Sequence, residues 1–131
     1  MLPEADLAYL QSRWPNHAIT QDGSSVLVVL PQFKLPEGFS PQAVDLLLVL
    51  PFGFPETQPD MFWVDPRVLL HGQPPQATEL QQPFLDRSWQ RFSRHLGPGA
   101  WKPGVDNLQS WLSMITTLLR READAGRAAA A

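Results

Sequence analysis

The sequence predicts a single α+β domain built on an antiparallel sheet. Three observations favour this class: an amphipathic helical pattern near each end of the chain, three short apolar segments between them, and links of about ten residues between those segments. Links of that length cannot hold the helix that a parallel crossover requires. The 131 residues suffice for one core, and the fourteen prolines and eight glycines indicate short elements joined by ordered loops.

The first element that the sequence predicts is a short amphipathic helix over residues 3–13. Pro3 suits a first helical position, acidic residues follow it in the first turn, and apolar residues recur at spacings of three and four as far as Trp14. Pro15 then stops the helix.

Three strands follow in an antiparallel meander. The first covers Ser25 to Leu30, begins after a turn at Asp22-Gly23, and is closed by Pro31. The second covers residues 42–50 and is apolar at nearly every position, which predicts burial on most of both faces. The third is the short segment 61–64, which lies between two prolines.

A second amphipathic helix is predicted from Asp106 to about Arg121. Apolar residues repeat there with helical spacing, and Asp106 and Gln109 stand in the N-cap and N3 positions of a capping box. The segment 122–131 lacks apolar residues large enough to dock, so we expect a frayed or disordered tail. The single domain is therefore expected to span residues 1–121.

The long segment between the third strand and this helix, residues 65–105, shows little periodicity. A loop of that length inside a compact domain is usually functional or disordered, and Trp89, Phe92 and Trp101 argue against disorder. We therefore expect the functional residues in this loop, with the glutamine-rich part 73–82 mobile.

Composition excludes several classes of function. The net charge of −3, with charged residues at only 18%, argues against a nucleic-acid partner. The absence of cysteine excludes disulfides, thiolate metal sites and every mechanism that needs a cysteine nucleophile. The three histidines lack metal-ligand spacing, so neither a metal nor another cofactor is expected. No apolar run has the length of a membrane span, and the first residues do not resemble a signal peptide, so we expect a cytoplasmic protein without a membrane partner.

The order of these elements resembles the ubiquitin-conjugating E2 (UBC) fold over about residues 1–121. The segment Gly53-Phe54-Pro55 through Pro59 is similar to the proline-rich turn that leads into the third strand of that family, and Trp101-Lys102-Pro103 resembles its tryptophan-x-proline after the active-site loop. The run Trp89-Gln90-Arg91-Phe92-Ser93-Arg94-His95 looks most like the bacterial group called prokaryotic E2 family E. This resemblance implies a ubiquitin-like protein and an E1-like activating enzyme as partners.

The sequence departs from the family pattern at the catalytic positions. The E2 cysteine lies eight residues before that tryptophan, which in this chain is Ser93. The His-Pro-Asn of the family, whose asparagine helps stabilise the oxyanion, would fall at Asp65-Pro66-Arg67. The resemblance therefore assigns Ser93 to the nucleophile position and His95 to a neighbouring one, with Asp65, Arg67, Trp89, Arg91, Arg94 and Trp101 as binding or loop residues.

Two functions stay open at this point. The first is a non-catalytic adaptor that binds the ubiquitin-like protein or the E1-like enzyme in a bacterial modification pathway. The second is an active transfer enzyme that uses Ser93, His95 or a cysteine of a partner, with Ser93 either an unusual nucleophile or a substituted cysteine. A serine oxyester holds its acyl group at lower free energy than a thioester and passes it on slowly, which favours the adaptor. A structural module that keeps only the fold is a third reading.

Overall fold

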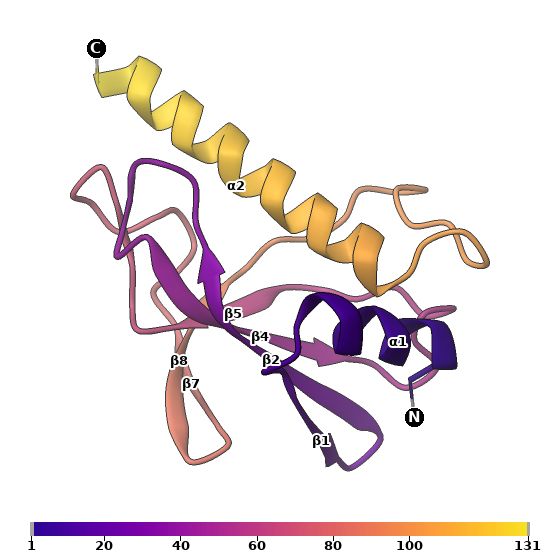
Figure 1. The fold of residues 1–131 in the computed structure, drawn as a ribbon. Helices are drawn as coiled ribbons and strands as arrows, with labels where there is room; N and C mark the ends of the chain where they lie inside the picture. Colours follow the sequence, from indigo (N-terminus) through magenta and orange to yellow (C-terminus); the bar gives the residue numbers. More distant parts are fainter. Residues whose placement is uncertain (1, 131) are drawn as a thin grey trace.

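The chain folds into two helices on one face of a curled antiparallel sheet (Figure 1). The computed structural model describes residues 2–130, and the side chains of residues 2–126. The predicted α+β class and the order of helix, meander, long connection and helix are confirmed. The elements are α1 (Glu4–Arg13), β1 (Ala18–Asp22), β2 (Ser25–Lys34), β3 (Phe39–Ser40), β4 (Ala43–Leu50), β5 (Phe62–Asp65), β6 (Leu69–Leu70), β7 (Gln81–Phe84), β8 (Arg87–Phe92) and α2 (Leu108–Ala130).

The main sheet has six strands in the order β1-β2-β4-β5-β8-β7, and each neighbouring pair is antiparallel. The strands β2, β4 and β5 form the predicted three-stranded meander, and the edge strand β1, which was not predicted, pairs with β2. A second, two-stranded sheet pairs β3 with β6. The strands β1 and β7 lie at opposite edges of the main sheet, where their two hairpins diverge below the helices (Figure 1).

The prediction that Pro31 closes the first strand is wrong, because β2 continues to Lys34. The pairing with β4 shifts by one residue between Leu30 and Phe33, which marks a β-bulge. A bulge leaves residues of one strand outside the hydrogen-bonded ladder, so a proline without an N–H is tolerated there. Gln32, next to Pro31, has a φ of 57° within this irregular step.

The long connection is not an irregular loop, because it contains the hairpin β7–β8, which extends the main sheet. Leu85 and Asp86 join the two strands as a two-residue turn, and both have positive φ. The glutamine-rich part is also held by backbone hydrogen bonds, from Arg91 N–H to the carbonyl of Leu80 (3.0 Å) and from Ser93 N–H to that of Ala77 (3.2 Å).

The N-terminus of α2 is capped one residue later than predicted. Asn107 Oδ1 accepts from the backbone N–H of Ser110 (2.9 Å), and Ser110 Oγ accepts from that of Asn107 (2.8 Å), so these two residues form the capping box. Asp106 instead closes the preceding loop by accepting from the backbone N–H of Lys102 (2.7 Å). Asp6 of α1 accepts from the backbone N–H of Leu108 (3.3 Å) and supplies a second cap.

The end of α2 also differs from the prediction, since the helix continues through Ala130 instead of ending near Arg121. Glu122 forms an ion pair with Arg94, and Ala123 is buried against the core. Charged and small side chains thus dock past the predicted helix end, while fraying of the tail 122–131 stays a prediction. The last predicted tail position, 131, lies outside the described residues.

The sheet separates two apolar clusters. The main core lies between the sheet and the helices and contains Trp111, Ile115 and Leu119 from α2. A smaller cluster lies on the other, concave face and consists of Leu27, Val29, Leu47, Trp63 and Trp89. None of the helices within residues 2–130 is both long and apolar enough to cross a membrane.

Candidate functional site

Ser93 immediately follows β8 and is partly buried. Its N–H donates to the carbonyl of Ala77 (3.2 Å), and its carbonyl accepts from Arg94 Nη1 (3.2 Å). Among the described residues the Ser93 hydroxyl makes no hydrogen bond, neither to His95 nor to a carboxylate. The backbone is therefore fixed while the hydroxyl lacks the hydrogen-bonded base that a serine nucleophile requires.

His95 pairs with Asp60, a residue that the sequence reading did not single out. His95 Nδ1 lies 2.8 Å from Asp60 Oδ1 and 3.0 Å from Oδ2, and both side chains are well exposed. A carboxylate on Nδ1 fixes the tautomer and leaves Nε2 as the ring's free acceptor. Asp60 lies just before β5, and His95 lies just after β8. The antiparallel pairing of these two strands brings Asp60 beside His95, so this pairing is the signal that would have revealed the contact.

Arg94 connects this segment to the end of α2. Its Nε and Nη2 donate to the two carboxylate oxygens of Glu122, each at 2.7 Å, and its guanidinium carbon lies 5.2 Å from the ring centroid of Phe92. Only 12% of the Arg94 side chain is exposed. A bidentate, largely buried pair of this kind anchors the loop against the helix. Arg94, which the resemblance lists among the binding or loop residues, thus ties the loop to α2.

Asp65 and Arg67 lie far from Ser93. Phe62 at the start of β5 pairs with Phe92, next to Ser93, whereas Asp65 is at the other end of β5, about 10 Å away along the strand at ~3.3 Å per residue. Arg67 is exposed beyond that end. The residues at the His-Pro-Asn position and the residue at the cysteine position therefore do not share one site.

The carboxylate of Asp65 is committed to an ion pair. Arg87 Nη2 lies 2.6 Å from Asp65 Oδ2 and 2.8 Å from Asp45 Oδ2, and the guanidinium stacks 4.3 Å from the ring centroid of Trp89. Burial alone would lower the pKa of Arg87, but the hydrogen bonds and charges of Asp65 and Asp45 raise it above its ordinary value. Because both carboxylates accept from Arg87, this cluster stabilises neighbouring strands and offers no oxyanion donor from Asp65.

The two tryptophans of the long connection, Trp89 and Trp101, are packing residues. Trp89 is fully buried in the concave cluster, and its Nε1 donates to the carbonyl of Phe84 (3.0 Å). Trp101 is 5% exposed, donates to the carbonyl of Pro55 (2.8 Å), and meets Trp111 edge to face. Arg91 lies opposite Trp63 in the sheet, and its buried Nε has no hydrogen-bond partner within the described part of the chain.

An apolar groove adjoins His95. It has a volume of about 700 Å³ and runs between α2 and the segment that follows His95. A smaller recess of about 30 Å³ lies beside it and is lined by His95 and Arg94 as well as by core residues. Leu96, Met114 and Leu118 border both spaces, so the groove and the His95 segment form one surface. The described residues contain no group of three or more His, Asp or Glu positioned to hold a metal ion.

The curled sheet under two helices, with a tryptophan-anchored loop that leads into the last helix, defines an E2-like α+β domain, and its sequence contains no cysteine. The chain belongs to prokaryotic E2 family E, because that family's model matches residues 2–122. No curated protein and no solved structure matches the chain significantly. The resemblance drawn from the motifs in residues 89–103 is thereby confirmed at the level of the family.

Proposed function

We propose that this E2-like protein is a non-catalytic adaptor that binds a ubiquitin-like protein, or the E1-like enzyme that activates it, in a bacterial modification pathway. The observation that carries the proposal is the apolar groove beside His95 in a chain without cysteine. An E2-like surface without a thiol can hold a partner but cannot form a thioester with it. The lack of a hydrogen-bonded base at Ser93 supports the same role.

The groove offers the kind of surface that an extended apolar segment of a partner fits. Its exposed lining has far more apolar than polar character, and Leu96 and Met114 contribute from opposite sides. Arg121 lies at one end of the groove and supplies a charge for orientation. Clefts of this size that combine an apolar lining with a few polar groups are typical of binding sites.

Binding is tested by titration calorimetry with the ubiquitin-like and E1-like proteins encoded by neighbouring genes. Leu96→Glu places a charge in the groove and should weaken binding by about tenfold or more. Leu85→Glu at the exposed hairpin turn is the matched control and should bind like the unmodified protein. A gene neighbourhood without such proteins, or equal binding by both variants, would contradict the adaptor.

One observation favours transfer activity as a second function. His95, which is two residues from Ser93 in the chain, pairs with the carboxylate of Asp60. In that case Ser93 Oγ would attack the carbonyl carbon of the ubiquitin-like protein's thioester or acyl adenylate, its proton would pass to His95 Nε2, and the E1 thiolate or AMP would leave. The product would be an oxyester that resists thiol reductants but is cleaved by base. The adaptor predicts no such adduct.

Ser93→Cys tests how much of a transfer site exists. With the E1-like enzyme, ATP and the ubiquitin-like protein, we expect this variant to form a thioester with the ubiquitin-like protein that thiol reductants cleave. The reason is that the substitution places a thiol where the resemblance puts the E2 cysteine. Discharge to lysine should stay slow, since loss of one oxyanion donor alone costs on the order of 100-fold. Ser88→Cys, on the exposed side of β8, is the control and should not be charged. Rapid transfer to lysine by Ser93→Cys would overturn the view that the oxyanion donors are missing.

A further inference from the structure

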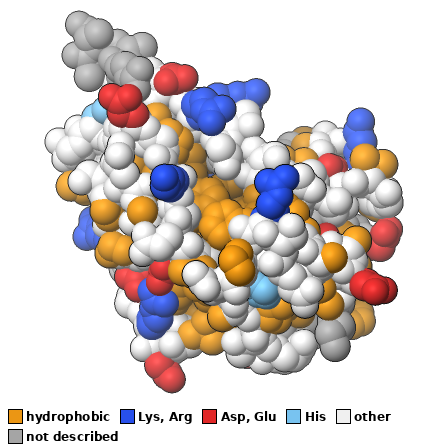
Figure 2. All heavy atoms as spheres, in the orientation of Figure 1, with side chains coloured by type: hydrophobic (Ala, Val, Ile, Leu, Met, Phe, Trp, Pro, Cys, Tyr) orange, Lys and Arg blue, Asp and Glu red, His pale blue; other side chains and the backbone are white. Residues whose placement is uncertain are grey.

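A second hollowed surface lies on the side of α2 that faces α1 and β2. One hollow of about 400 Å³ lies between α1, β2 and α2, and a second of about 420 Å³ lies between α2 and the segment after β2. Both are lined by Thr116 and Arg120, so they join into one furrow. Figure 2 shows this face, with exposed hydrophobic side chains along the middle and Lys and Arg side chains on both sides of them.

Three exposed cations line this basic furrow, and each comes from a different element. Arg13 lies in the last turn of α1 and lines the first hollow, Lys34 ends β2 and lines the second, and Arg120 of α2 lines both. Within residues 2–126 none of the three forms an ion pair, unlike Arg87 and Arg94. In the first hollow, Arg13 and Arg120 therefore face no carboxylate, whereas the second hollow carries Glu37 and Asp124 beside its cations.

The floor of the first hollow is aromatic. Trp14 and Phe33 stack there with ring centroids 5.9 Å apart, and Tyr9 lies at the same hollow. Hydroxyl groups of α2 line its other side, from Ser113, Thr116 and Thr117, and no acidic residue lines it. This chemistry matches a ligand that carries negative charge together with an apolar side chain and backbone groups that accept or donate hydrogen bonds.

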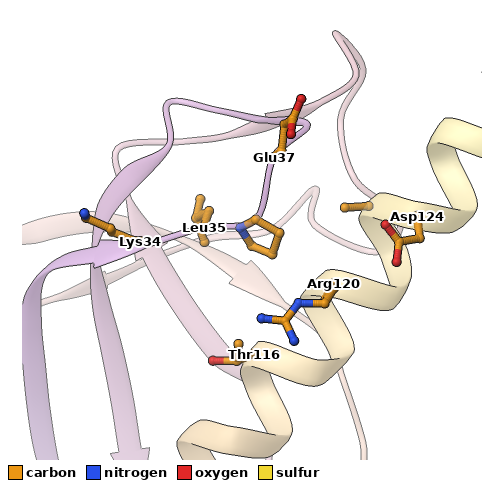
Figure 3. A pocket seen from close by; sticks show the side chains of 8 residues that line it. Lys34, Leu35, Glu37, Thr116, Arg120 and Asp124 are labelled. Carbon is orange, nitrogen blue, oxygen red and sulfur yellow. The ribbon is translucent and has the colours of Figure 1, made fainter.

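The second hollow limits what the ligand can be. Figure 3 shows Arg120 reaching from α2 toward the strand that carries Lys34, with Asp124 on the next turn of the helix and Glu37 on the loop. A nucleic acid, with charge on every phosphate, would meet these two carboxylates. A peptide can place its carboxylates only opposite the cations, and the net charge of −3 also disfavours a polyanion.

We propose that the basic furrow binds an acidic peptide segment of a partner protein, with an apolar side chain of that segment on Trp14 and Phe33. The cations span both hollows, which fits an extended ligand better than a single small anion. This surface is separated from the groove beside His95 by the exposed ridge of α2, where Ser113 and Thr117 border both. The proposal therefore does not rest on the proposed function.

Fluorescence polarisation tests the proposal with a fluorescein-labelled peptide in which Glu and Asp flank a central Phe. The same peptide with Gln and Asn in place of the acids is the matched ligand control. We expect the acidic peptide to bind at least about tenfold more tightly than the neutral one. Arg13→Gln combined with Arg120→Gln should weaken binding of the acidic peptide about tenfold, since each exposed ion pair that is lost lowers the affinity by a few-fold. Lys102→Gln, an exposed lysine elsewhere, should not change it.

Amide chemical shifts locate the bound peptide on the full chain. We expect the largest changes at Trp14, Phe33 and Thr116, and weakening of binding as salt is added. Equal binding of the acidic and neutral peptides, unchanged affinity of the double variant, or no binding at all would overturn the proposal. Tighter binding of single-stranded oligonucleotide, or complete displacement by inorganic phosphate, would also overturn it, because either would identify a different ligand.

Discussion

Asp6 is a buried carboxylate that belongs to one helix and caps another. It is 3% exposed, its Oδ1 accepts from Leu108 N–H at the start of α2, and its Oδ2 is buried without a hydrogen-bond partner among the described residues. Burial raises the pKa of Asp6 above its ordinary value, and the hydrogen bond from Leu108 offsets this only in part. The residue therefore couples helix packing to proton binding.

The Asp6→Asn variant should reveal this coupling as a pH dependence. Because the folded pKa is raised, the carboxyl contributes stability that is complete below the ordinary value of 3.8 and is lost as the pH rises through the folded pKa. The unmodified protein should therefore lose stability relative to Asp6→Asn as the pH rises from 3.8 through the folded pKa. Denaturant titrations from about pH 3.5 to pH 7 measure this loss, and a gain in relative stability with rising pH would contradict the assignment.

At the scale of elements, the last turns of α2 are held by an ion pair, a hydrogen bond and the close packing of a histidine ring. Arg94 pairs with Glu122, and His71 Nε2 donates to the carbonyl of Ala123 (2.9 Å). The His71 ring lies against Gly38 and Gly126, where an added Cβ would come within 2.7 Å of a ring carbon. The two glycines thus allow the ring to sit between the loop and the helix.

Glu122→Ala should lower the free energy of unfolding by about 1–3 kcal/mol, because it leaves the largely buried guanidinium of Arg94 without its partner. Asp124→Ala, two residues along and exposed, is the control and should change stability by less than about 0.5 kcal/mol. Chemical denaturation measures both. A loss below about 0.5 kcal/mol for Glu122→Ala would show that the helix end is not anchored by this pair.

The β7–β8 hairpin turns through Leu85 and Asp86, both at positive φ (55° and 60°), which non-glycine residues adopt at a cost. Replacing the pair by Asn-Gly, the residues that such a turn favours, should stabilise the protein by about 1 kcal/mol. The thermal midpoint reports the change. A lower midpoint would mean that Leu85 contributes packing that outweighs the backbone strain.

The sequence predicted the elements that have strong hydrophobic patterns. It did not predict the features that depend on contacts between segments distant in the chain. The apolar segments that became β4 and β5 and the helical spacing of α2 are visible without a structure. The hairpin was missed because its turn is Leu-Asp and not Asn-Gly, and because Arg87 and Arg91 interrupt its apolar alternation. Asp60, the partner of His95, was missed because their contact depends on the pairing of β5 with β8.

At the scale of the whole molecule, the two apolar clusters share the same strands. Leu46 of β4 belongs to the main core and Leu47 to the concave cluster, so successive residues face opposite sides. The concave cluster is completed by Trp63 and Trp89, with Phe84 of the hairpin packed edge to face on Trp63. Loss of either cluster should therefore destabilise the sheet that supports both.

Trp89→Ala should lower the free energy of unfolding by about 3–5 kcal/mol, since Trp89 is fully buried. Unfolding should still occur in one transition, with far-UV circular dichroism and the fluorescence of the remaining tryptophans changing together. Two separated transitions would show that the concave cluster and its hairpin form an independent unit.

The contact between Asp6 and Leu108 joins residues that are 102 positions apart in the chain. During synthesis the N-terminal helix leaves the ribosome first, and its carboxylate stays hydrated until nearly the whole domain has been translated. The last helix can receive this cap only when all strands between them have emerged. Nascent chains halted before residue 108 should therefore lack the native contact between α1 and α2, however well their sheet has begun to pair.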